Sequence, residues 1–173
     1  MADPGTERMI LSRGIRVLDG LIGGILSFGR LLALPVVLLL FLQWPLRDLV
    51  QAYSREANDL GQWLFALYVA MAVTAATRAR THLATDLIAR GYTARTRERL
   101  LRAAALIGVL PWALFVIVAG KGIVVSSVLA RETFPDTTNP GYFVVKLALW
   151  VLAGLMLAQG LVDLFRPSHE GET

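Results

Sequence analysis

Apolar residues gather in four long stretches along the chain, and shorter polar segments separate them. The stretches cover approximately residues 22–46, 60–79, 103–129 and 142–165. A helix rises about 1.5 Å per residue, and the hydrocarbon core of a bilayer is about 30 Å thick, so roughly 20 apolar residues can cross it. The pattern therefore predicts an all-α membrane protein, in which four transmembrane helices form one integral membrane domain over residues 1–173.

The segment before the first stretch has a different periodicity. Within residues 9–30, polar or small residues recur every three or four positions, on the side of the helix opposite the apolar residues. These polar or small residues are Arg16, Asp19, Gly23, Ser27 and Arg30. This spacing predicts an amphipathic N-terminal extension that lies in the headgroup plane or turns its polar stripe toward a partner helix. Pro35 and Pro111 fall inside predicted spans, where we expect kinks.

Composition narrows the function. Hydrophobic residues make up 55% of the chain and cysteine is absent, which rules out disulfides, thiolate metal sites and cysteine nucleophiles. The net charge is +4, but the basic residues stand beside apolar runs rather than over a polar face. We therefore expect no nucleic-acid partner.

The basic residues also predict orientation. The segment between the second and third spans carries most of the loop arginines: Arg78, Arg80, Arg90, Arg95, Arg97, Arg99 and Arg102. The other two connections carry only Arg47, Arg55 and Arg131. By the positive-inside rule, both termini and the central loop are expected in the cytoplasm.

A ridge of polar residues follows the second span. Arg78, His82, Asp86 and Arg90 are each four positions apart, so on a continuous helix each side chain reaches the next. The spacing predicts an interfacial cytoplasmic helix with arginines among lipid phosphates, and Thr93 as the cap of the following helix. The ridge either only sets topology or also makes a specific contact with another chain.

Groups that could carry chemistry in the membrane are few. One histidine and one carboxylate in the ridge leave a zinc site two ligands short, and neither histidine of the chain lies in a span to bind haem. Lys121, Lys146 and Asp163 lie toward span ends, where their charges are expected to reach the interface. We assign no catalytic, cofactor-binding or metal-binding residue, and expect a membrane subunit that supports another chain and is not an enzyme.

The connection before the last span contains candidate docking groups. Asp136, Thr137 and Tyr142 could contact a partner on the outer side. The same stretch includes Asn-Pro-Gly, which is strong turn chemistry, and this favours a locally capped turn over a docking site.

The layout resembles the small membrane subunit, DctQ type, of tripartite ATP-independent periplasmic (TRAP) transporters. The likeness extends from about Ile15 to Arg166. It is carried by Arg47 at the end of the first span and, after the second span, by Arg80 followed by His82 and Asp86 in a His-x-x-x-Asp pattern. The connection Glu132 to Tyr142 before the last span also carries it, as do three residues within that span: Lys146, Trp150 and Gln159. An arginine typical of the family between the histidine and the aspartate is replaced by Ala84, which puts any contact of that arginine in doubt.

The resemblance implies sodium-coupled uptake of organic anions, often carboxylates, across a bacterial cytoplasmic (inner) membrane. It implies two partners besides membrane lipids: a large TRAP membrane subunit that the small one braces, and a periplasmic substrate-binding protein. Candidate partner contacts are Arg47, Arg78, His82, Asp86, Asp136, Thr137 and Tyr142. Two alternatives stay open: a lipid-headgroup enzyme that uses the basic loop 78–102, and a homo-oligomeric channel supported only by Lys121.

Overall fold

A computed structural model describes residues 4–50, 54–79 and 92–165. These residues form six α-helices and one π-helical turn: α1 (Pro4–Leu31), α2 (Ala33–Asp48), α3 (Arg55–Ala79), α5 (Ala94–Ala104), η1 (Ala105–Val109), α6 (Leu110–Leu129) and α7 (Tyr142–Phe165). Four helical stretches in this part of the chain are long and apolar enough to cross a membrane. The predicted all-α fold with four spans is therefore confirmed.

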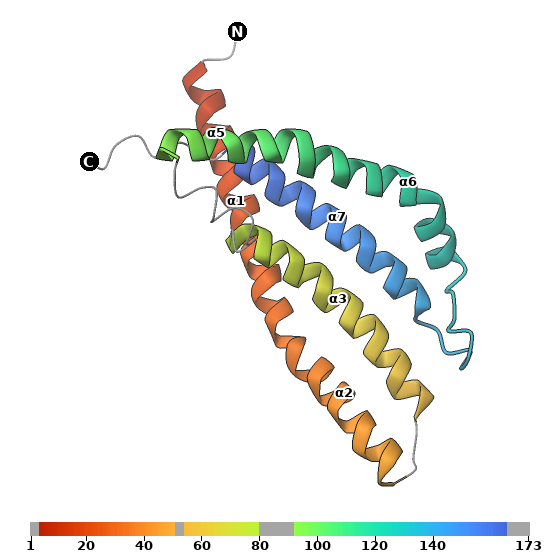
Figure 1. Cartoon of the computed structure of the whole chain (residues 1–173). Helices are drawn as coiled ribbons and strands as arrows, with labels where there is room; N and C mark the ends of the chain where they lie inside the picture. Colours follow the sequence, from red (N-terminus) through yellow and green to blue (C-terminus); the bar gives the residue numbers. More distant parts are fainter. Residues whose placement is uncertain (1–3, 51–53, 80–91, 166–173) are drawn as a thin grey trace.

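The spans form a single layer rather than a bundle around a central axis. Figure 1 shows α2, α3, α7 and α6 side by side in that order, with α1 crossing near the end of α3. α3 packs against α2 and α7, and α7 packs against α3 and α6. α2 and α6 thus form the two edges of the layer, and each packs mainly on one of the central spans.

The first span begins with a helix break whose position was not predicted from the sequence pattern. We expected a kink at Pro35, but the helix is interrupted at Leu32, and Pro35 lies in the first turn of α2. Proline has no N–H to donate to the carbonyl four residues earlier, which is that of Leu31. The turn is instead closed by Leu32 N donating to Gly29 O at 3.1 Å.

The second proline coincides with a change of helix type. Pro111 has no N–H for the carbonyl of Ile107, and the preceding turn, η1, widens to π-helical hydrogen bonding, in which Leu110 N donates to Ala105 O. This stretch lies against α7 at Gly160, where an added Cβ would come within 3.0 Å of Leu110 Cδ2. The predicted irregularity at Pro111 is thus a π-turn where α6 approaches α7 closely.

The core lies where α1, α3 and α7 meet. Its fully packed members come from these three helices: Ile22, Leu26, Met71, Leu155 and Val162. Gly29 of α1 lies so close to α3 that a Cβ there would come within 2.7 Å of Met71 Sδ. Outside this junction most apolar side chains face outward. Of the 18 most apolar consecutive residues in each span, 17% are buried in the α6 stretch and 28% in α7.

Candidate functional site

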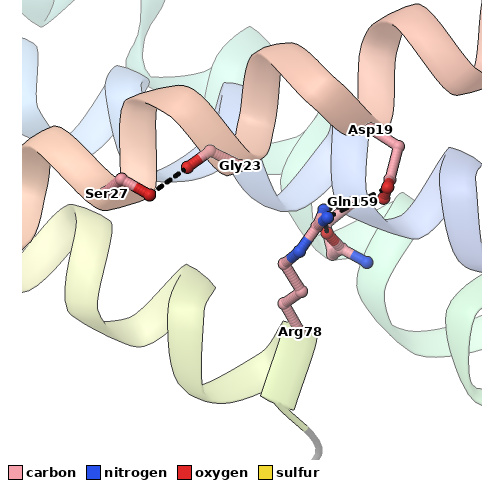
Figure 2. A network of polar contacts seen from close by, with 5 residues as sticks. All are labelled: Asp19, Gly23, Ser27, Arg78 and Gln159. Atoms are coloured by element: carbon pink, nitrogen blue, oxygen red, sulfur yellow. Dashed lines mark hydrogen bonds and ion pairs between the residues drawn. The ribbon is translucent and has the colours of Figure 1, made fainter.

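Three helices meet at a polar cluster, which we call the Arg78 cluster and which consists of Asp19, Arg78 and Gln159. Arg78 Nη1 lies 2.7 Å from Asp19 Oδ1, and Nη2 donates to Oδ2 at 3.0 Å. Nη1 also donates to Gln159 Oε1 at 3.3 Å. In Figure 2 the guanidinium extends from the end of α3 to the space between α1 and α7. One cation thus joins three helices that are far apart in the sequence.

The neighbouring residues leave room for this guanidinium. Gly23 stands one helical turn beyond Asp19, and a Cβ there would lie 3.7 Å from Arg78 Nη2. Gln159 is 2% exposed within the apolar α7, so its carbonyl needs an internal donor, and Arg78 supplies one. The side chains of Arg78 and Asp19 are each 31% exposed. An ion pair that also contains a directed hydrogen bond restrains the distance and direction between the two helices.

The predicted ridge stays a prediction. Arg78 was expected to share a helix face with His82 and Asp86, which lie outside the described residues together with Arg90. Within the described chain, the partners of Arg78 come from α1 and α7. The interfacial helix predicted after the second span also falls in that undescribed part. The predicted cap at Thr93 is confirmed, because its side chain accepts a hydrogen bond from Thr96 N at 3.4 Å at the start of α5.

A second polar cluster lies at the other end of α7. This Glu132 cluster consists of Ser127, Glu132 and Lys146. Lys146 Nζ lies 2.5 Å from Glu132 Oε2, and Ser127 donates to the same oxygen. Hydrogen bonds from Lys146 and then from Ser127 lower the pKa of the Glu132 carboxyl below its usual value. Lys146, which was expected only to reach the interface, is thus also the partner of a carboxylate.

Aromatic residues pack beside the Glu132 cluster. The ammonium of Lys146 lies 5.3 Å from the centre of the Tyr142 ring, within the range of a cation–π contact. The edge of Tyr142 meets Phe134, which is 3% exposed, at a centroid distance of 5.4 Å. Tyr142 therefore anchors the first turn of α7 to the preceding connection.

The connection between α6 and α7 is a closed turn. Phe134 N donates to Asn139 O at 2.9 Å, and Thr138 N donates back to Phe134 O at 2.9 Å. Gly141 has a φ of +148°, which favours glycine, and a Cβ there would lie 3.3 Å from Phe134 Cε2. The turn chemistry expected from Asn-Pro-Gly is therefore present.

Thr137 fastens this turn to α3. Its hydroxyl donates to Asp59, a residue that is only 6% exposed. Thr137 Oγ1 also accepts from Asn139 N at 3.3 Å. Asp136 is exposed and lines an open hollow of about 310 Å³ together with Arg55, Asn58 and Asp59. Of the predicted contact residues in this turn, Asp136 is thus exposed, whereas Thr137 is engaged inside the protein.

Arg47 lies at the end of α2. Its Nε donates to Asp48 Oδ1 at 2.9 Å in a pair whose side chains are 64% and 43% exposed. With Leu40, Gln43 and Trp44 it lines a hollow of about 200 Å³. The residue is therefore accessible at an edge helix of the layer.

Sequence reasoning missed Gln159 as a structural contact, and Asp19 and Glu132 as ion-pair partners. A signal existed for Gln159, because an amide inside an apolar span requires a donor or acceptor from another helix. Within the described residues no group of three or more histidine, aspartate or glutamate side chains is placed to hold a metal ion. The Arg78 cluster, the Glu132 cluster and the Thr137–Asp59 contact each join different elements of the fold, which is the geometry of structural ties.

The fold and these ties define a multi-span membrane protein with a flat layer of helices and broad exposed apolar faces. A family model described as "Tripartite ATP-independent periplasmic transporters, DctQ component" matches residues 36–169. The chain belongs to this family, the small membrane component of TRAP transporters. The match begins after α1, later than the start near Ile15 that the resemblance had suggested. No curated protein and no solved structure matched the chain.

Proposed function

We propose that this chain braces the large membrane subunit of a TRAP transporter in the inner membrane of a bacterium. In this role it takes part in sodium-coupled uptake of organic anions, often carboxylates, that a periplasmic binding protein delivers. Family membership supports the transporter assignment. The observation that carries the bracing role is the layer of helices itself, in which one ion pair joins α3 to α1, another joins α7 to the connection before it, and wide apolar faces remain for a partner.

In this proposal the Arg78 end of the layer is cytoplasmic and the Glu132 end periplasmic. The arginine distribution supports this orientation. The turn with exposed Asp136 then faces the binding protein, while Thr137 and Tyr142 hold its shape. His82, Asp86 and Arg47 are proposed as contacts with the large subunit or with lipid headgroups.

The test is reconstitution in liposomes with a sodium gradient. The chain, the large subunit and the binding protein together should take up a labelled organic anion, and omission of this chain should abolish uptake. The chain alone should give neither saturable binding nor uptake. Robust uptake by the chain alone would favour the channel alternative and overturn the bracing role.

Contact residues are tested by recovery of the complex. His82→Ala and Asp86→Ala should each lower the amount of large subunit that co-purifies with the tagged chain. If both variants recover as much partner as the wild type, these residues serve topology alone.

A further inference from the structure

The α6 edge of the layer carries a charge that has no partner among the described residues. Lys121 is exposed on α6, eight residues before the helix ends at Leu129, which corresponds to about 12 Å along the helix axis. A four-carbon stem covers roughly half of that distance, so the ammonium falls short of the end of the helix. A charge in such a place gains more from a nearby opposite charge than it would in water.

Two carboxylates at this end of the described chain are engaged elsewhere, and a third, Asp136, is exposed in the turn after α6. Glu132 pairs with Lys146 and accepts from Ser127. Asp59 is buried and accepts from Thr137. Neither ion pairs nor hydrogen bonds of the described residues involve the Lys121 ammonium. Among the described residues no carboxylate pairs with Lys121, so we look to a partner chain for the opposite charge.

The surface beside Lys121 suits a closely packed helix. Phe115 is 68% exposed and Val118 71% exposed on α6, on the side of the helix away from its buried residues Ala113 and Val124. Gly122 follows Lys121 at this edge, and a Cβ there would meet nothing within 4 Å. Small residues at such positions let a second helix backbone approach closely in a membrane. Apolar anchors, a glycine and a cation thus lie together on one unoccupied face.

We propose that this α6 edge, comprising Phe115, Val118, Lys121, Gly122 and Leu129, is where the large subunit docks, and that Lys121 pairs with a carboxylate in one of its spans. The inference rests on the proposed function and adds which edge meets the partner and through which charge. The opposite edge, α2, then faces lipid over its apolar length.

The test compares variants of the full chain in complex with the large subunit in nanodiscs. Lys121→Met keeps the length of the side chain but removes its charge, and should weaken binding of the large subunit about tenfold or more, because the partner carboxylate is left unpaired. Gly122→Leu adds bulk only where the isolated chain has open space, and should weaken binding similarly while leaving the Tm of the isolated chain unchanged.

Two phenylalanines give a matched control for the edge. Phe115 of α6 and Phe41 of α2 are 68% and 66% exposed. Phe115→Ala should weaken binding, whereas Phe41→Ala should leave it unchanged. Equal effects of the two changes, or a larger effect of Phe41→Ala, would overturn the choice of edge.

The charge partner is tested by rescue and by lipid composition. Changing the membrane-embedded carboxylates of the large subunit to amides one at a time should restore the binding of Lys121→Met in one case. The loss should also be the same in discs of zwitterionic and of anionic lipid. A loss confined to anionic lipid would identify a lipid phosphate as the counter-charge and overturn the proposal.

If the wild-type chain binds no large subunit at all, the proposed function itself fails. If the wild type binds and neither Lys121→Met nor Gly122→Leu weakens binding, only the docking face fails.

Discussion

Arg78 of α3 forms an ion pair with Asp19 of α1, in which Nη1 lies 2.7 Å from Oδ1 and Nη2 donates to Oδ2 at 3.0 Å. The family match begins at residue 36, so this pair connects a helix outside the matched region to one inside it. Gln159 of α7 adds a third helix to the same guanidinium. The position of α1 on the layer therefore depends on a few directed polar contacts as well as on apolar packing.

We expect Asp19→Asn to destabilise the attachment of α1. The change leaves Arg78 without its charged partner in a partly buried place, and should cost about 1–2 kcal/mol. Thermal unfolding in detergent measures the effect. Asp48→Asn is the matched control, because its pair with Arg47 is more exposed and exposed pairs contribute about 0–1 kcal/mol. Equal losses in the two variants would contradict a special role for the Asp19 contact.

Stability is expected to depend on pH through Glu132. The pKa of this carboxyl is lowered in the fold from its ordinary value of 4.5, chiefly by the hydrogen bond from Lys146. The charged form therefore contributes stability above pH 4.5, and the contribution is lost as the pH falls through the lowered folded pKa. Glu132→Gln should lower the Tm at pH 7, and the gap to the wild type should close in acid. A gap that stays constant from pH 7 to pH 3 would show that the effect is not electrostatic.

Two glycines of α1 should respond oppositely to the same substitution. At Gly29 an added methyl group meets Met71 within 2.8 Å, at its Cβ and Sδ, whereas nothing lies within 4 Å at Gly24. Gly29→Ala should therefore lower the free energy of unfolding by about 1–3 kcal/mol through overpacking. Gly24→Ala should be neutral, or stabilising by up to about 1 kcal/mol, because alanine favours the helix. Reversible unfolding in mixed micelles gives both values, and a stabilised Gly29→Ala would argue against the close α1–α3 contact.

Thr137→Val should loosen the turn between α6 and α7. The buried carboxylate of Asp59 loses a donor, which should cost about 1–3 kcal/mol. In liposomes the same variant should also reduce uptake that depends on the binding protein, if the turn is a docking surface. Thr133→Val, at an exposed position of the same turn, serves as the control. Normal stability and uptake in both variants would leave the turn without a measurable role.

The spans could be predicted because their signal is local: a long apolar stretch predicts a helix whatever surrounds it. The cap at Thr93 and the turn around Asn139 are local in the same way. The break at Leu32 was misplaced to Pro35, since a missing N–H affects the turn before the proline rather than the proline itself.

The polar ties could not be predicted, because they depend on packing between distant helices. The sequence offered Arg78 only neighbours at helical spacing, and so suggested a ridge with His82. The structure brings Arg78 to Asp19 and Gln159, on helices whose order in the layer no periodicity reveals. Glu132 and Lys146 are likewise brought together by the turn between them.

The side-by-side arrangement of α2, α3, α7 and α6 has a mechanical consequence. The two outermost helices, α2 and α6, are linked mainly through α3 and α7, which lie between them. Repeat proteins, whose units contact only their neighbours, are linked in the same way. A disturbance at one margin is attenuated before it arrives at the other. Either margin can therefore move with whatever it touches while the far margin keeps its place.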